Sequence, residues 1–411
     1  MERPNDLWRG GPWEQPAPSP ADLPRVSVPS SPRPPVLRTR RRRNRWPWFA
    51  GVLALVAVLC LSTALLNLFL TLHPPGGATP GGAPSDAQEM AQSTTPPSIP
   101  QVEGDPGAEI TLLPPGTAPL SYTQIYERTA PSFVSISAAS ASGYNTGSGL
   151  ILSQDGYLIT NAHVVAGAQE VLVQLSDSRV FSAGLVGFDA DEDLAVLKIE
   201  ADGLTPAQFG NSDDLRCGDP VAALGDSLGY RATFTDGIVS ALDREVELDD
   251  GTTMTLIQTS AAINFGNSGG PLLNQYGQVV GITTIKIISD DGSAESMGFA
   301  IPSTRVRYVV QQLLAGEEVR NSVFVFTVNL VLVDGSGLEL ISVSPESDAW
   351  AKGLRPGDII TAVNGQAVTG IRELTRARQG NGPGTLVAIT YLRDGATYVA
   401  EVALVDAEQI P

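Results

Sequence analysis

The segment Gly266-Asn267-Ser268-Gly269-Gly270-Pro271 has the composition of a loop that presents one hydroxyl between glycines. Glycine adopts backbone torsions that a Cβ forbids, so a substrate can approach Ser268 closely and consecutive amides can point into one space. Such amides are what an oxyanion hole requires. Taken alone, a string of this kind is more often an ordinary loop, so the interpretation depends on finding a base for the serine.

A serine hydroxyl is a weak nucleophile until a neighbouring base accepts its proton. The chain has two histidines, and His163 is the one in the folded part, because His73 ends a long apolar run. A carboxylate is then needed to orient the imidazole. Asp193 directly precedes the apolar run 194–199, where a carboxylate can be partly buried, and this favours it over Asp191. The chain order His, Asp, Ser is that of chymotrypsin-type barrels.

Short runs of β-branched and aliphatic residues, broken by Gly, Asp and Asn, recur from about residue 122 onward. Short strands at this spacing are typical of an all-β barrel or sandwich. The expected strands are 133–136, 149–152, 171–175, 194–199, 221–224, 255–258 and 279–282. A helix is expected over 303–314, with Ser303 as its N-cap and an apolar stripe at helical spacing.

Several of these segments resemble motifs of the HtrA/Deg family of serine proteases. They are 160–165 (TNAHVV), 193–199 (DLAVLKI), 266–272 (GNSGGPL), 237–240 (GIVS) and 298–302 (GFAIP). The resemblance covers about residues 120–406. It implies a mainly β fold, with a chymotrypsin-like double β-barrel over residues 121–315 followed by a PDZ domain over residues 323–406. It also implies degradation of misfolded or damaged proteins of the cell envelope.

The resemblance also assigns roles by motif. His163 would be the base, Asp193 the orienting acid and Ser268 the nucleophile. The amides of Gly266 and Ser268 would form the oxyanion hole, with Asn267 shaping the loop between them. No cofactor and no metal is expected, because hydrolysis by such a site needs neither.

The sequence departs from the family pattern around the site. Phe265 stands where Pro or Ala is usual, Ser260 where Asp is usual, and Thr283 where Asn is usual. These changes bear on loop conformation and pocket shape rather than on the triad. Ala262, six residues before Ser268, implies an S1 pocket without a carboxylate, suited to small aliphatic side chains. Such a pocket discriminates by only about 1–3 kcal/mol per methylene.

The last part of the chain contains a second motif. Residues 353–360 (GLRPGDII) resemble a PDZ domain, although the same string can simply mark a turn that enters a strand. PDZ domains bind extended peptides at a sheet edge. The loop that captures a peptide carboxylate is expected near residues 323–326, where the glycine usual in the family is missing. Unfolded polypeptides or protein C-termini are the expected partners, and binding of free C-termini stays open.

The N-terminal part of the chain differs from the rest in composition. Residues 1–45 are Pro-rich and carry 10 Lys/Arg against 4 Asp/Glu, so we expect a disordered cytoplasmic tail. Residues 46–72 contain no charge and can span a bilayer as one helix. The preceding arginines favour a cytoplasmic N-terminus, with the catalytic and PDZ domains outside the cytoplasm. A cleaved signal peptide is the alternative. Residues 73–120 have linker composition.

Net charge and cysteine content exclude other classes. Residues 46–411 carry 16 Lys/Arg and 40 Asp/Glu, and an acidic body argues against nucleic acid as a partner. Two cysteines form no multi-bridge framework and no Cys/His zinc cluster. The family usually forms trimers, and Tyr122, Tyr126 and Phe133 are either interface or core aromatics. A chaperone or adaptor, and a signalling protease for one partner, remain alternative functions.

Overall fold

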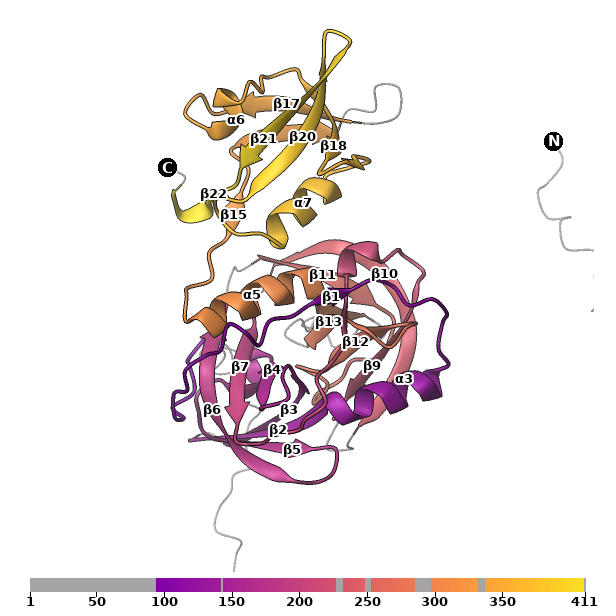
Figure 1. Cartoon of the computed structure of the whole chain (residues 1–411), viewed down its shortest axis with the longest axis vertical. Coiled ribbons are helices and arrows are strands. Elements are labelled where there is room, and N and C mark those ends of the chain that lie inside the picture. The colour runs from indigo at the N-terminus through magenta and orange to yellow at the C-terminus, as the bar shows by residue number, and fades with distance from the viewer. Residues whose placement is uncertain are drawn as a thin grey trace, which may run out of the picture. The chain divides into compact units, whose positions relative to one another are not determined.

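The structure is a computed structural model, and it describes residues 94–141, 143–226, 232–247, 253–284, 297–330 and 337–409 (Figure 1). The predicted cytoplasmic tail (1–45) and transmembrane helix (46–72) lie outside these residues, as does most of the first half of the predicted linker. Within the described ranges, no helix combines the length and the apolar composition needed to cross a membrane.

Six strands close into a first barrel in the order β2-β3-β4-β7-β6-β5. Their bounds are β2 Phe133–Ser140, β3 Gly143–Ile151, β4 Tyr157–Thr160, β5 Ala168–Leu175, β6 Val180–Asp189 and β7 Leu194–Ile199. The run 194–199 becomes β7 with the expected bounds, because both faces of this strand are buried and its sequence is continuously apolar.

The second barrel belongs to an eight-stranded sheet of order β1-β8-β13-β12-β9-β10-β11-β14, and the additional β13–β14 pairing closes six of these strands into a ring. The bounds are β1 Leu112–Leu113, β8 Phe209–Gly210, β9 Pro220–Gly225, β10 Thr233–Glu247, β11 Thr253–Thr259, β12 Pro271–Asn274, β13 Val279–Thr284 and β14 Gly298–Pro302. Every strand expected from the sequence here is present. The mainly β, double-barrel fold is therefore confirmed.

Helix α5 (Ser303–Ala315) packs against strands of both barrels. Its apolar stripe joins one core cluster with residues of both barrels, among them Leu194 and Ile282. The prediction that Ser303 caps this helix is wrong. Pro302 occupies the N-cap, and Ser303 is buried inside the first turn, where its hydroxyl donates to Gly210 O at 2.7 Å. The serine thus ties the helix start to β8.

The other short elements frame the barrels. Helix α3 (Tyr122–Thr129) begins with a capping box between Ser121 and Gln124, and α4 (Ala162–Val165) is a single turn. The 3₁₀ turns are η2 Ala130–Ser132, η3 Ser212–Asp214 and η5 Ala407–Gln409. Of the aromatics expected at an interface or in the core, Phe133 is 2% exposed and belongs to the core. Tyr122 and Tyr126 stay exposed and pack edge-to-face on Phe234.

The linker predicted over residues 73–120 differs in its described part. Ile99 and Ile110 are buried, Val102 N donates to Leu185 O at 2.8 Å, and β1 pairs with β8. Residues from about 95 onward thus pack against the protease domain. Isolated apolar residues in a Pro-rich stretch give no periodicity, which is why composition alone indicated a linker.

The last unit is a six-stranded sheet, flanked by helices, in which five strands follow the order β16-β17-β18-β20-β21 and β19 lies off this path. The bounds are β15 Ser322–Val323, β16 Phe326–Leu330, β17 Leu338–Val343, α6 Asp348–Ala351, β18 Ile359–Val363, β19 Gln366–Ala367, α7 Arg372–Gln379, β20 Leu386–Arg393, β21 Ala396–Ala403 and β22 Val405–Asp406. β15 pairs with β22, and β19 with β18. Apolar residues of the sheet and of α7 form one core.

Candidate active site

Asp193 ends the turn between β6 and β7 and is 1% exposed. Its φ of +51° lies in the left-handed region, which aspartate tolerates better than most residues with a Cβ. Its buried carboxylate accepts hydrogen bonds from the backbone amide of His163 at 3.1 Å and from the hydroxyl of Thr284 at 2.8 Å. A buried carboxylate with donors on several sides is held in one orientation.

His163 stands on α4, directly after β4. Its Nδ1 lies 2.9 Å from both carboxylate oxygens of Asp193. With a carboxylate as partner, Nδ1 carries the proton and Nε2 is left as the acceptor in the neutral ring. The side chain of His163 is 21% exposed, so the outer part of the ring meets solvent. The Asn161 amide donates to Asp193 O at 2.8 Å and thereby ties the start of α4 to the turn.

The loop around Ser268 is bonded to both barrels. Ser268 O accepts from Ser148 N of β3 at 2.8 Å, and Gly266 O accepts from Ser148 Oγ at 2.7 Å. On the other side, the Thr283 hydroxyl donates to Asn267 O at 2.6 Å. Gly266 and Gly269 have φ of +97° and +84°, values that favour glycine. The two glycines that the sequence singled out on either side of Ser268 are thus required by the backbone.

Adjacent residues of β13 bring the two halves of the site together. Thr283 holds the loop of Ser268, and Thr284 holds Asp193. A methyl group placed on Gly147 would clash with Val164, next to His163, and would lie 3.1 Å from Ser268 O. His163 and Asp193 therefore contact each other, and the loop of Ser268 is bonded to the neighbouring residue of β13 at the same seam between the barrels. The Ser268 hydroxyl is buried, and within the described ranges it has no hydrogen-bond partner, so the contact to His163 is not closed.

Within residues 266–270, the backbone amides of Gly266 and Ser268 make no hydrogen bond to any described residue. The amide between them, Asn267 N, donates to Asn264 O at 3.0 Å. The Asn267 side chain is buried and donates to Ala262 O at 3.3 Å. The amides of Gly266 and Ser268 are the two that the resemblance assigns to an oxyanion hole.

Other positions from the sequence lie around this site. Ala262 is exposed, and its carbonyl oxygen also accepts from the Thr235 hydroxyl at 3.0 Å. Ser260 Oγ accepts from Ile238 N at 3.0 Å, so it has a structural contact where the family has a carboxylate. Phe265 is 57% exposed beside Gly266. No cluster of three metal-ligating side chains occurs among the residues that the structure describes.

Comparison with known proteins identifies the relatives of both domains. The model of the trypsin-like peptidase domain matches residues 147–282, and that of the PDZ domain matches residues 317–404. The solved "HtrA-type protease AlgW with tripeptide" is 34% identical, over 70% of this chain and 97% of that chain, with a TM-score of 0.52. The chain belongs to the HtrA-type family of serine proteases. These matches support a serine endopeptidase.

Curated relatives of the HtrA type extend the comparison. A "Probable periplasmic serine protease do/HhoA-like" of Haemophilus influenzae is 40% identical over 63% of this chain and 58% of its own length. A "Probable periplasmic serine endoprotease DegP-like" of Chlamydia trachomatis is 40% identical over 64% of this chain and 54% of its own length. This chain therefore spans about half the length of the curated relatives that it matches.

The structure adds residues that the sequence did not single out for this site. Thr284 donates to Asp193, Ser148 binds the loop of Ser268 twice, and Asn161 fixes the turn. Each of these polar side chains is buried or lies at a buried strand end. A hydroxyl at the end of the apolar run 279–284 was the available signal, because a buried hydroxyl requires a partner.

Proposed function

We propose that the chain is an extracytoplasmic serine endopeptidase with His163, Asp193 and Ser268 as its catalytic triad. The observation that carries the proposal is the pair of 2.9 Å contacts from His163 Nδ1 to the buried Asp193 carboxylate. A base oriented in this way, at the same seam as a serine flanked by glycines, is the arrangement that acyl transfer needs.

In the proposed reaction, Ser268 Oγ attacks the carbonyl carbon of the peptide bond while His163 Nε2 takes the hydroxyl proton. Asp193 stays ionised and stabilises the imidazolium. The amides of Gly266 and Ser268 bind the oxygen on which charge develops. His163 then protonates the leaving amine, and a water molecule hydrolyses the acyl-enzyme by the same steps. We expect the hydrogen bond between Ser268 and His163 to close with substrate bound, because such contacts often tighten only in the complex.

For the proposed substrate we infer an unfolded polypeptide with a small aliphatic residue at P1. Ala262 brings no carboxylate to the expected S1 floor, so selection of Arg or Lys is not supported. The PDZ domain supports binding of an extended chain, because β16 is the terminal strand of its sheet order. At residues 323–326, Phe324 and Phe326 stack with ring centroids 5.0 Å apart, so a peptide carboxylate would meet apolar side chains there.

For the location, we propose that residues 46–72 anchor the chain in the cytoplasmic membrane, with residues 1–45 inside and both folded domains outside. The charge-free run supports this, as do relatives named periplasmic. Misfolded envelope proteins are then the accessible substrates. We further propose a homotrimer in which the exposed Tyr122 and Tyr126 contact a neighbouring copy.

The test is labelling of the full-length chain with a fluorophosphonate probe, followed by peptide mapping and by cleavage of unfolded casein. We expect label on Ser268 alone, and loss of label and cleavage in Ser268→Ala. Asp193→Asn should slow both by orders of magnitude while leaving the fold intact. Cleavage that survives Ser268→Ala would remove the triad assignment. Prevention of casein aggregation without any cleavage by the wild-type chain would instead favour a chaperone.

A further inference from the structure

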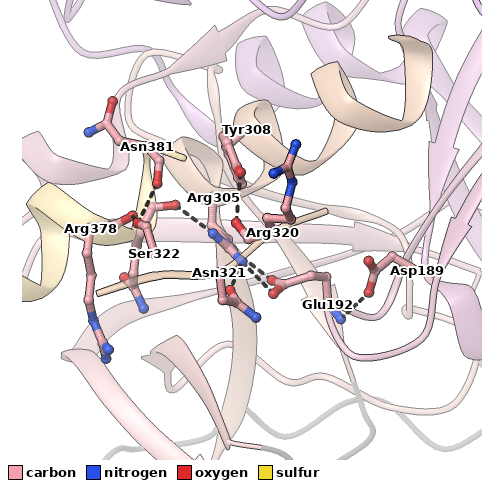
Figure 2. A network of polar contacts seen from close by, with 10 residues as sticks. Asp189, Glu192, Arg305, Tyr308, Arg320, Asn321, Ser322, Arg378 and Asn381 are labelled. Carbon is pink, nitrogen blue, oxygen red and sulfur yellow. Dashed lines mark hydrogen bonds and ion pairs between the residues drawn. The ribbon is translucent and has the colours of Figure 1, made fainter. Parts of the chain in front are cut away.

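The turn that carries Asp193 is attached to helix α5 by a nearly buried ion pair (Figure 2). Arg305 donates from Nε to Glu192 Oε2 at 2.8 Å and from Nη2 to Glu192 Oε1 at 2.5 Å. The two side chains are 8% and 12% exposed. Glu192 directly precedes Asp193. A bidentate pair of this kind fixes geometry as well as adding energy.

Hydrogen bonds also form within the turn. Asp193 N donates to Ala190 O at 3.3 Å, and Glu192 N donates to Asp189 Oδ1 at 2.9 Å. Asp193 also holds a left-handed φ, which costs a residue with a Cβ about 1–2 kcal/mol relative to the right-handed region. A conformation of this kind persists only where the surroundings fix it. The ion pair to α5 is such a constraint.

The turn also gathers several negative charges near Arg305. Asp189, Asp191, Glu192 and Asp193 lie within five residues, and Arg305 is the cation hydrogen-bonded to them through Glu192. The pKa of Asp189 is raised to about 6, mainly by burial and also by the charges of Glu192 and Asp191, against the lowering effects of the hydrogen bond from Glu192 N and of the Arg305 charge. Without the guanidinium, the neighbouring carboxylates would repel one another in a partly desolvated environment.

The guanidinium also has partners beyond the protease barrels. Its Nη2 contacts Asn321 Oδ1 at 2.5 Å, and its Nη1 donates to Gln379 O at 3.1 Å, at the end of α7. Its plane lies over the Tyr308 ring, with 5.1 Å to the centroid. Each of the three guanidinium nitrogens thereby donates at least one hydrogen bond, so the position of Arg305 is fixed from both sides (Figure 2).

We infer that Arg305 is a positioning residue for the hydrolytic reaction: through Glu192 it holds the turn so that the Asp193 carboxylate meets His163. The inference rests on the proposed triad. Arg305 does not contact the reacting atoms. Its contribution is to keep Asp193 in place, with its own orientation set by Asn321 and Gln379.

The experiment uses the full-length chain and measures kcat, KM and the rate of fluorophosphonate labelling. Arg305→Met keeps the length of the side chain and removes the charge. We expect kcat and the labelling rate to fall by about 10- to 100-fold, the effect of a misplacement near 1 Å, with KM within about twofold. Arg305→Lys should recover part of the loss. Arg320→Met is the matched control, because Arg320 is 57% exposed and pairs with Asp406 at 3.8 Å, so it should change neither rate.

Two further variants distinguish positioning from general destabilisation. In an Asp193→Asn background, Arg305→Met should add less than about a twofold loss, because residues that act through one another are not additive. A full further loss there, or an unchanged kcat in Arg305→Met alone, would overturn the inference. Glu192→Gln keeps the shape of the side chain and removes its charge, so it replaces Arg305→Met if that variant fails to fold. It should lower kcat as well, and a wild-type kcat would count against the inference. If Asp193→Asn itself keeps full activity, the proposed triad fails instead.

Discussion

Asp189→Asn should stabilise the protease domain at neutral pH and leave it unchanged in acid. The half-buried Asp189 carboxyl stands at the end of β6, and burial raises its pKa from 3.8 to about 6. The charges of Glu192 and Asp191 act in the same direction, whereas the hydrogen bond from Glu192 N and the charge of Arg305 oppose them. Asparagine keeps the oxygen that accepts from Glu192 N and carries no charge.

The magnitude follows from the pKa. A folded pKa above the unfolded value means that the folded state holds the proton more tightly, so stability is lost as pH rises from about 4 through about 6. Each tenfold change in proton affinity is worth about 1.4 kcal/mol, which gives a ceiling of about 3 kcal/mol above pH 7. Solvent that reaches the carboxyl lowers this ceiling. For a domain of this size, each kcal/mol shifts Tm by about 2–4 °C.

The assay is differential scanning calorimetry of the full-length wild type and variant between pH 4 and pH 8, following the transition of the protease domain. The difference in unfolding free energy should be near zero at pH 4 and grow to a plateau above pH 7. Asp177→Asn is a control of opposite sign, because hydrogen bonds from Arg179 lower the pKa of the exposed Asp177. A pH-independent difference for Asp189→Asn, or a loss of stability at pH 8, would refute the reasoning.

The remaining predictions concern the site and its surroundings. Thr284→Val removes a hydrogen bond to the Asp193 carboxylate, so steady-state kinetics should show kcat about 10- to 100-fold lower. Thr284→Ser keeps the hydroxyl and should stay near the wild-type kcat. Equal kcat values for the two variants would contradict this role of Thr284. Phe133→Ala should cost the protease domain about 3–5 kcal/mol in calorimetry, because the ring is buried. Tyr126→Ala should cost only about 0.5–1.5 kcal/mol, from its contact with Phe234, and should shift sedimentation towards smaller species. An unshifted sedimentation profile would count against the proposed trimer contact. Phe265→Ala should leave Tm unchanged, because the ring is 57% exposed, and should raise KM a few-fold for apolar peptides. A fall in Tm would show instead that the ring contributes to the packing of the folded domain.

The strands and the reacting residues could be predicted because each has a local signature. The run 194–199 became β7 with the expected bounds, since a strand buried on both faces needs a continuous run of apolar residues. Ser268 and Asp193 were found from their immediate neighbours. The N-cap of α5 was missed because Ser303 has a better partner, Gly210 O, that is distant in sequence. Propensity for a cap is a local quantity, and tertiary contacts override it.

The geometry of the site depends on contacts at the seam between the two barrels, and no local sequence pattern predicts these contacts. Asp193 and His163 come from the first barrel, and Ser268 and Thr284 from the second, so their contacts join residues far apart in the chain. The Thr284–Asp193 contact spans 91 residues and the Arg305–Glu192 contact spans 113. Neither partner of such a pair is constrained by its own neighbours. A single sequence can therefore identify the atoms that react, while the residues that hold them within reach emerge only once the barrels are packed. It follows that substitutions at this seam should change kcat more than they change the stability of either barrel, and the comparison of Thr284→Val with Phe133→Ala measures that difference directly.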